Sequence, residues 1–248
     1  MSSQTKSAQA KNPNFKPLYA QVKELMIRRL VDNTWTAGMA LPSENQLAKE
    51  LKVSQGTVRK ALDEMTVENL LVRRQGRGTF VAEHTQHRAL FHFLHLVGEN
   101  DNRQLPQSQL ISIATGPADN LESQQLELDS NAPVIRLFRV RFLNEQPVIS
   151  ETITVPYALF PELVQQKELI PNSLYSLYER QYGISVARAV ERLSAESAQG
   201  EIARQLALAP GTPLLCIQRT AYSLNSRPVE LRISRCNTQH HHYLSELT

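Results

Sequence analysis

The chain has 248 residues, with 27 lysines and arginines, 24 aspartates and glutamates, and a formal net charge of +3. This length suits two domains, and two cysteines are too few for a disulfide framework. No apolar run reaches the roughly 18 residues that cross a membrane, and the N-terminus lacks the apolar stretch of a signal peptide. We therefore expect a cytoplasmic protein with no membrane partner.

Positive charge is concentrated near the N-terminus. Residues 1–84 hold 13 basic against 8 acidic side chains, a net of +5, whereas the remainder has a net of −2. This bias suits phosphate binding by the N-terminal part, and the small total argues against a sequence-blind binder of nucleic acid. Residues 1–14, rich in Ser, Gln, Lys and Ala, predict a disordered tail.

Three helices are expected before residue 70. The first opens at Pro17 and carries an apolar face that includes Val22, Leu25, Met26 and Leu30. Ser43, with Gln46 three residues later, predicts a capping box at the start of the second helix. Ser54 caps the third helix after a short corner at Lys52-Val53, a spacing typical of a helix-turn-helix. In such motifs the first turn of the second helix of the pair enters the major groove.

Gly56 lies in that first turn and costs roughly 1 kcal/mol of helix stability relative to alanine. Close approach of the backbone to a phosphate would explain it, and a tolerated glycine on a capped surface helix would explain it equally well.

A basic hairpin is expected next. Residues 71–74 and 79–81 alternate as strands, and Gly76 and Gly78 permit the positive φ of a tight turn between them. Arg73, Arg74 and Arg77 beside the turn could reach phosphates or a minor groove. A charge cluster is usually a solvated face, but its place directly after a recognition-helix pattern favours DNA contact.

Residues 16–82 together resemble the GntR family of bacterial transcription regulators, which carries a winged helix-turn-helix. The resemblance implies double-stranded operator DNA as the partner and a homodimer, because paired half-sites mirror a two-fold protein. Asn45 departs from the arginine common after the Pro-Ser-Glu triplet, and Gln55 occupies a variable position. The expected DNA-binding residues are Ser43, Asn45, Ser54, Gln55, Gly56, Thr57, Arg59, Arg74, Gln75, Gly76 and Arg77.

Histidines in two segments raise the question of a metal. His84, His87, His92 and His95 lie in the connector of residues 84–96, and His240 to His242 follow Cys236. Acidic or cysteine partners at ligand spacing are missing from the connector pattern, so we expect a linker, a surface C-terminal segment and no metal or cofactor.

The remaining sequence predicts an α+β domain with a mostly antiparallel sheet. Strands are expected at residues 110–114, 134–142, 148–155, 186–194, 214–223 and 229–234, and helices at 118–126, 157–167, 173–182 and 200–208. The pattern Leu143-Asn144-x-x-Pro147-Val148 recurs as Leu224-Asn225-x-x-Pro228-Val229, which indicates two equivalent hairpins around a cleft, or convergent turns. In this alignment Glu151 corresponds to Arg232.

Residues 95–245 resemble the UTRA effector-binding domain of HutC-type GntR regulators, which has a chorismate-lyase-like fold. The resemblance rests on Arg139-Val140-Arg141-Phe142, Ser173-Leu174-Tyr175 and Arg227-Pro228-Val229-Glu230. The C-terminal end departs from the family, with Arg235-Cys236-Asn237-Thr238-Gln239-His240 where an Arg-Gly-Asp-Tyr-like segment is common. Effector contacts in that family fall at positions that here are Arg139, Arg141, Glu151, Ser173, Tyr175, Arg188 and Glu230.

Arg139 and Arg141 are two residues apart on a strand, so they share one face. Two guanidiniums there suit a small anion of the sugar phosphate or carboxylate class, with Ser173 and Tyr175 adding hydroxyl and amide donors at a helix start. Glu151 could accept sugar hydroxyls or an amine. The alternative is a structural ion pair between Arg139 and Glu151 across the hairpin.

Two other classes of function were weighed. A lyase-like fold allows an enzyme, but no Ser-His-Asp set, metal cluster or nucleotide loop is legible, and fold alone does not imply activity. An architectural DNA-binding protein would lack an effector, which the arginine-bearing strand argues against. We therefore expect a ligand-responsive homodimeric transcription repressor, not an enzyme, with a DNA-binding domain at 15–83, a linker at 84–96 and an effector domain at 97–248.

Overall fold

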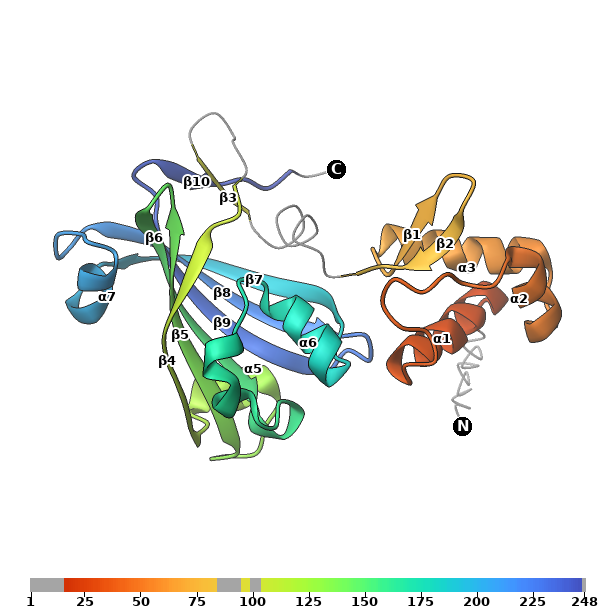
Figure 1. Ribbon diagram of the computed structural model, residues 1–248, viewed down its shortest axis with the longest axis horizontal. Coiled ribbons are helices and arrows are strands. Elements are labelled where there is room, and N and C mark those ends of the chain that lie inside the picture. Colours follow the sequence, from red (N-terminus) through yellow and green to blue (C-terminus); the bar gives the residue numbers. More distant parts are fainter. Residues whose placement is uncertain (1–15, 84–94, 99–103, 247–248) are drawn as a thin grey trace, which may run out of the picture.

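The computed structural model describes residues 16–83, 95–98 and 104–246, and its elements form two groups (Figure 1). The predicted tail at 1–14 and the connector residues 84–94, with His84, His87 and His92, lie outside the described residues. In the described residues, no helix is both long and apolar enough to cross a bilayer. The domain limits chosen from the sequence stay a prediction.

The N-terminal group contains α1 (Leu18–Val31), α2 (Glu44–Leu51) and α3 (Gln55–Val67). Local chemistry sets the helix limits. The Ser43 side chain accepts from the Gln46 amide while the Gln46 side chain accepts from the Ser43 amide, and Lys52 ends α2 in the left-handed region. The Ser54 side chain accepts from the Thr57 amide and starts α3. The helices enclose a core that includes Met26, Trp35, Leu47, Val58, Leu62 and Met65.

The wing follows α3 as an antiparallel pair, β1 (Leu71–Arg74) and β2 (Gly78–Val81). Gly76 and Gly78 have φ values of +68° and +109°, backbone conformations that favour glycine, as the sequence predicts. The Leu41 amide donates to the Thr79 carbonyl, which ties the segment before α2 to the wing. These contacts fix the wing beside the two helices of the helix-turn-helix.

The C-terminal group is built on a six-stranded antiparallel sheet in the order β4-β5-β6-β9-β8-β7. This confirms the predicted α+β class. The strands are β4 (Gln107–Pro117), β5 (Pro133–Leu143), β6 (Gln146–Pro156), β7 (Val186–Ser197), β8 (Pro213–Ser223) and β9 (Pro228–Asn237). The helices are α5 (Asn120–Leu126), α6 (Leu174–Tyr182) and α7 (Gly200–Gln205).

The strand order reveals two similar halves. Each half runs strand, helix, strand, strand, first as β4-α5-β5-β6 and then as β7-α7-β8-β9, and the halves meet at β6 and β9. Matching backbone bonds close the two helical loops, from the Ala118 amide to the Ala132 carbonyl and from the Ala198 amide to the Thr212 carbonyl, both at 2.8 Å. The Leu-Asn-x-x-Pro-Val echo is therefore part of a longer repeat. Its two hairpin turns lie at opposite ends of the sheet (Figure 1).

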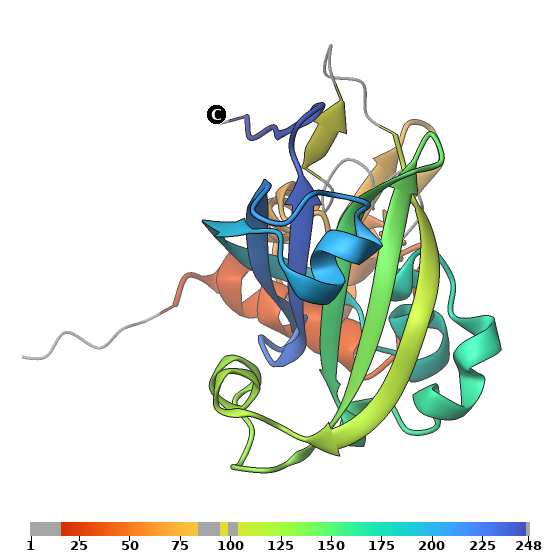
Figure 2. The same ribbon diagram turned by 90° about the vertical axis from the view of Figure 1, so that its left-hand side faces the viewer.

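The two sheet faces are covered differently. α6 packs on one face through Leu174, Leu177 and Tyr178, over a core that includes Leu137 and Ile153. α5 and α7 cover the other face, where the Thr154 hydroxyl donates to Glu122 of α5 and the Ser150 hydroxyl donates to Gln205 of α7. Figure 2 shows α7 crossing in front of the strands.

Two segments differ from the sequence predictions. Residues 157–167 form short 3-10 helices, η3 (Tyr157–Leu159) and η4 (Leu163–Leu169), rather than one helix, because Glu162 adopts a positive φ of 66° between them. β3 (Leu96–Gly98) and β10 (His241–Tyr243) pair as a small separate sheet that the sequence did not predict. β10 places Tyr243 against a core that includes Leu96 and Leu143.

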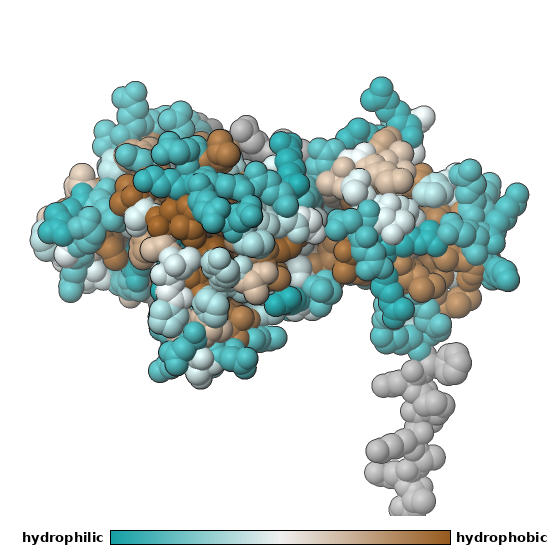
Figure 3. Space-filling model, turned by 60° about the horizontal axis from the view of Figure 1, so that its bottom comes forward, coloured by the Kyte–Doolittle hydropathy of each residue, from teal (hydrophilic) through white to brown (hydrophobic). Residues whose placement is uncertain are grey.

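The two groups touch at the end of α6 and at the β8–β9 turn. Leu224 of that turn and Ala187 of β7 pack against the core of the N-terminal group. Gly183 ends α6 with a φ of +64°. The side chain of Asn33 packs closely against it, because a Cβ added at Gly183 would lie only 3.0 Å from the Asn33 amide nitrogen. A cavity of about 380 Å³ lies beside this contact, with Trp35 on one side and Val186 on the other. Figure 3 shows apolar side chains where the groups meet.

Candidate DNA and effector sites

The predicted DNA-binding residues gather on one exposed surface. Ser54, Gln55 and Gly56 open α3 in exposed positions, Arg59 follows one turn later, and Ser43 and Asn45 lie exposed at the start of α2. Thr57 is half-buried, and its hydroxyl lies 2.8 Å from that of Ser54. The structure thus brings the α2 and α3 residues of this prediction together.

Packing within the chain does not require glycine at position 56. A Cβ there would meet only the Ser54 hydroxyl oxygen, at an ordinary 3.9 Å, and the backbone φ is not positive. Alanine would therefore fit and favour the helix by roughly 1 kcal/mol. The reason for the glycine must lie outside the folded chain, or the position tolerates it.

The wing presents three arginines with different surroundings. The Arg74 guanidinium lies 4.6 Å from the centre of the Phe80 ring, and Arg77 is exposed beside Gly76 and Gln75 at the turn. Arg73 pairs with Asp63 of α3 at 2.6 Å. Arg74 and Arg77 are therefore the wing guanidiniums best placed to meet phosphate.

Sequence analysis missed one central residue of this surface. The Glu44 carboxylate accepts from the Arg59 Nε at 3.0 Å and from the Gln55 side-chain amide at 3.2 Å, and it lies 3.6 Å from Arg73. The hydrogen bond from Arg59 holds the pKa of Glu44 below its usual value, so the side chain is ionised at neutral pH. Only the acidic character of the Pro-Ser-Glu triplet hinted at this contact.

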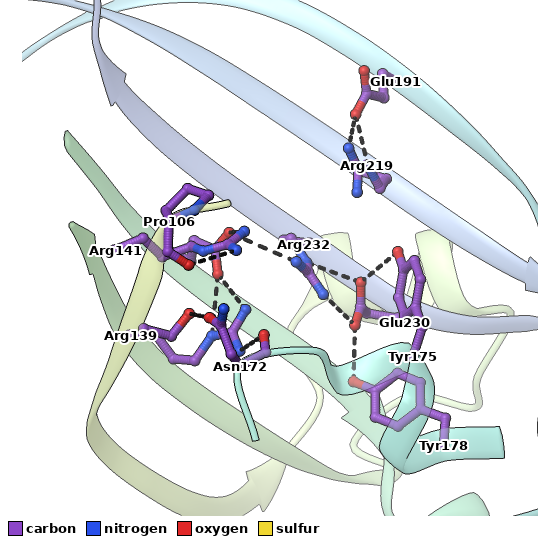
Figure 4. Close-up of polar contacts among 12 residues, drawn as sticks. Pro106, Arg139, Arg141, Asn172, Tyr175, Tyr178, Glu191, Arg219, Glu230 and Arg232 are labelled. Atoms are coloured by element: carbon purple, nitrogen blue, oxygen red, sulfur yellow. Dashed lines mark hydrogen bonds and ion pairs between the residues drawn. The ribbon is translucent and has the colours of Figure 1, made fainter. Parts of the chain in front are cut away.

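A buried charged cluster lies on the α6 face of the large sheet (Figure 4). Glu151 of β6 accepts from the Arg139 Nη2 at 2.7 Å and from its Nε at 3.1 Å. Arg141 Nη1 and Arg232 Nη1 approach the other Glu151 oxygen at 3.5 and 3.6 Å. The three guanidiniums come from β5 and β9 and converge on one carboxylate.

The cluster continues to Glu230 of β9. Its carboxylate accepts from Arg232 at 2.9 and 3.0 Å, from the Tyr175 hydroxyl at 3.1 Å and from the Tyr178 hydroxyl at 2.8 Å. Both tyrosines belong to α6, so this helix is tied to the charged cluster by two hydroxyl groups. Beyond them, Arg219 donates to Glu191 at 2.6 Å, and the Tyr243 hydroxyl of β10 also donates to Glu191.

Burial shapes the titration of these groups. Burial alone would raise the pKa of Glu151, but Arg139, Arg232 and Arg141 outweigh it and hold that pKa well below its usual value. Burial lowers the pKa of Arg141 to about 10, with Glu151 partly opposing the shift. Burial and the nearby Glu230 charge raise the pKa of Tyr175 to about 12. At neutral pH Glu151 and Arg141 are charged, and the Tyr175 hydroxyl is a hydrogen-bond donor.

Arg141 is the least satisfied member of the cluster. Its side chain is 8% exposed, its contacts to Glu151 and to the Pro106 carbonyl are both 3.5 Å long, and its Nε has no hydrogen-bond partner in the described residues. A buried guanidinium nitrogen without a partner is costly, so such an atom marks a place for a further acceptor.

The predicted effector residues do not all meet. Arg139, Arg141, Glu151, Tyr175 and Glu230 share the cluster, and Ser173 lies beside it, as the residue before α6 and next to Asn172, whose carbonyl accepts from Arg139. Arg188 is exposed on the edge strand β7, with its guanidinium 3.8 Å from the centre of the Tyr222 ring.

The predicted alternative for Arg139, an ion pair with Glu151 across the hairpin, is present. Sequence analysis missed four members of the cluster, Arg219, Arg232, Glu191 and Tyr178. The hairpin echo, which matches Arg232 to Glu151, was the one signal that pointed to any of them. Among described residues, no three His, Cys, Asp or Glu side chains could hold a metal ion.

A winged helix-turn-helix with an exposed basic face, joined to a separate α+β domain with a buried charged cluster, defines a two-domain DNA-binding regulator of transcription. Comparison with known families agrees. The chain belongs to the gntR family of bacterial regulatory proteins: the family's own model matches residues 18–81, and the UTRA domain model matches residues 102–242. The resemblance drawn from the sequence is therefore confirmed.

Known relatives match this chain over most of their length. The chain is 31% identical to the HTH-type transcriptional repressor NagR of Bacillus subtilis, over 86% of this chain and 88% of that protein. It is 30% identical to the histidine utilization repressor of Pseudomonas putida, over 90% of this chain and 90% of the relative. The family and these relatives are described as regulators of transcription.

Solved structures support the fold. The ligand-binding domain of a Bordetella bronchiseptica protein assigned to GntR-family transcriptional regulators is 30% identical, with a TM-score of 0.59 over 64% of this chain and 99% of that chain. PhnF from Mycobacterium smegmatis, 24% identical, gives a TM-score of 0.54 over 92% of this chain and 99% of that one, and so shows the shared fold alone.

Proposed function

We propose that the chain is a homodimeric repressor whose affinity for operator DNA is set by a small anionic metabolite bound at the buried charged cluster. The observation that carries the effector part is the Arg139, Arg141 and Arg232 group around Glu151, with the Arg141 Nε left without a partner in the described residues. Sugar phosphates and carboxylates offer the acceptor oxygens that such guanidiniums bind best.

An entering anion would compete with Glu151 for the arginines. Arg139 donates from Nη2 and Nε to one Glu151 oxygen at 2.7 and 3.1 Å, whereas the contacts of Arg141 are 3.5 Å long, so Arg141 would turn to the ligand at least cost. Ser173 makes no side-chain cap bond, and its hydroxyl could add a donor beside the anion. Glu230 would accept ligand hydroxyl or amine groups. A role for Arg188 stays a prediction.

For DNA, α3 would lie in the major groove, with Ser54, Gln55 and Arg59 towards the bases. Close passage of a phosphate would use the open space at Gly56, and Arg74, Arg77 and Gln75 of the wing would contact the backbone. A single recognition helix reads few base pairs, so we propose a homodimer on paired half-sites. A protein with this target acts in the cytoplasm.

α6 offers a route between the two sites. Its first turn binds Glu230 through Tyr175, its last residues place Gly183 against Asn33, and the β8–β9 turn beside it carries Leu224 into the N-terminal core. A ligand that changes the bonds of Glu230 would shift α6 and this turn together. The coupling is then the difference in ligand affinity between two placements of the DNA-binding group.

The names of relatives suggest a ligand panel without choosing from it. They include the histidine utilization repressor, a probable fructoselysine utilization operon repressor of Escherichia coli, and the mannosyl-D-glycerate transport/metabolism system repressor of the same species. Histidine, fructoselysine, mannosyl-D-glycerate, hexose phosphates and inorganic phosphate therefore form a first thermal-shift set.

The deciding experiment measures both sites in one preparation. An operator duplex is first selected by the protein from a randomised library, and its affinity is then measured with and without each compound that raises the melting temperature. A compound that changes operator affinity at least tenfold supports the proposal, as does a dimer mass in light scattering. Operator affinity that no stabilising anion changes would favour an architectural DNA-binding protein, and chemical turnover of a stabilising compound would favour an enzyme.

A further inference from the structure

Glu44 places a negative charge in the middle of the surface assigned to DNA. It is the first residue of α2, yet its carboxylate is bonded to two side chains of α3, Arg59 and Gln55, and lies close to Arg73 of the wing. Its side chain is 24% exposed, against 57% for Arg59 and 44% for Arg73. The Glu44 side chain is therefore less exposed than either of the arginines beside it.

A carboxylate at this place opposes DNA binding in general. In the proposed complex it would lie near the phosphates and would offset part of the positive charge that drives counterion release. A residue that lowers the affinity for DNA in this way should contribute to DNA binding in some other respect. The other acid of α2 with an arginine partner, Glu50, pairs instead with Arg29 of α1 at 2.5 Å.

Glu44 restricts the conformations of two side chains of α3. Gln55 and Arg59 are four residues apart on α3, so they lie on one helix face, and one carboxylate binds both. A free arginine side chain samples many rotamers, and an exposed arginine would lose that entropy on docking to a base. The Glu44 oxygen takes up the Nε and one Nη of Arg59 and leaves the other Nη directed elsewhere.

We propose that Glu44 is a positioning residue for DNA recognition, which holds Arg59 and Gln55 in one arrangement and so raises discrimination between operator and unrelated DNA while lowering total DNA affinity. This inference rests on the proposed role of α3 as the recognition helix. It assigns specificity to a residue that touches base-reading side chains rather than bases.

The test compares Glu44→Gln with a matched control, Glu50→Gln, which removes the same charge from the same helix. Fluorescence anisotropy at fixed salt gives the affinity for a duplex selected from a randomised library by the wild-type protein, and for a scrambled duplex of equal length. We expect Glu44→Gln to bind the scrambled duplex more tightly and to lose about tenfold in the ratio of the two affinities, the scale of one base contact. Glu50→Gln should keep the ratio.

Glu44→Asp separates position from charge. The aspartate keeps the negative charge, but it is one methylene too short to reach Arg59 and Gln55 together. A falling ratio in Glu44→Asp supports positioning, whereas a ratio that stays at the wild-type value in both variants overturns it. In the background of Arg59→Ala, Glu44→Gln should change the ratio less than it does in the wild-type protein, because one of the two side chains through which Glu44 acts is gone.

Two failures remain distinguishable. If the wild-type protein selects no sequence from the library, the proposed function is wrong and the inference falls with it. If the wild-type protein selects a sequence and the Glu44 variants keep its ratio, the proposed function stands and only the inference is wrong. Thermal unfolding of each variant shows whether a lower affinity for both duplexes comes from a damaged fold.

Discussion

Arg141→Ala is the substitution that most directly tests the effector site. Arg141 lies in the buried cluster with two contacts of 3.5 Å and an Nε without a partner in the described residues, so it does little for the ligand-free fold. Breaking a buried ion pair commonly costs roughly 3–5 kcal/mol. We expect less here, because Glu151 keeps the short bonds of Arg139 and the approach of Arg232.

The charges of the cluster lead to the same expectation. Four arginines, Arg139, Arg141, Arg219 and Arg232, face three acids, Glu151, Glu191 and Glu230, so the ligand-free cluster carries one surplus positive charge. Removing Arg141 makes the formal charge of the cluster zero. In the wild-type protein, a bound monoanion would do the same. Loss of one charge-assisted contact should weaken anion binding by roughly 1.5–3 kcal/mol, or about 10- to 150-fold.

Isothermal calorimetry with the strongest compound of the thermal-shift panel measures this loss, and a duplex titration of the ligand-free variant checks that DNA binding is kept. Arg192→Ala is a suitable control, because Arg192 is exposed on β7 and bonds Gln125 on the opposite sheet face. Undiminished anion affinity in Arg141→Ala would show that Arg141 is a structural partner of Glu151 and that the ligand binds elsewhere.

Three further outcomes are expected. Arg59→Ala should weaken operator binding by more than about 1 kcal/mol with the fold intact, and an unchanged gel-shift titration at fixed salt would remove Arg59 from the interface. Arg77→Ala should lower affinity for operator and unrelated DNA alike and reduce the slope of log affinity against log salt by about one, whereas a loss confined to operator would indicate base readout. Glu151→Gln should destabilise the protein by roughly 3–5 kcal/mol at pH 7. Because the folded-state pKa of Glu151 is depressed, the wild-type advantage is complete above the unfolded pKa of about 4.3 and shrinks as pH falls below it. Urea unfolding at pH 7 and pH 3 checks this, and a constant difference would contradict it.

Local signals made the DNA-binding part predictable. The Ser43 and Ser54 side chains cap their helices by accepting from amides three residues later, and Gly76 and Gly78 of the wing have positive φ values. Each helix cap and the wing turn depend on a few consecutive residues, so they can be predicted from the local sequence. The role of Glu44 was not predicted, because its partners belong to another helix and to the wing.

The buried charged cluster was predictable only in part, for the same reason. Arg139, Arg141 and Glu151 belong to one hairpin, so their shared face follows from strand periodicity. Arg232 joins them because β9 pairs with β6, and that pairing joins strands far apart in the chain. β10 was not predicted, because the sequence His-His-Tyr has no alternating pattern. It is a strand because it pairs with β3.

The repeat in the C-terminal group exchanges its helices. α5, from the first half, packs on Leu231 of β9, and α7, from the second half, bonds Ser150 of β6, so each helix covers a strand of the opposite half. The main apolar core under α6 also draws on both halves, with Leu137 and Ile153 from the first and Ala221 and Val229 from the second. The consequence is cooperative folding: the two halves should melt in a single transition, and a fragment cut between α6 and β7 should not fold. A regulator built this way cannot loosen one half of the buried charged cluster while the other half keeps its structure.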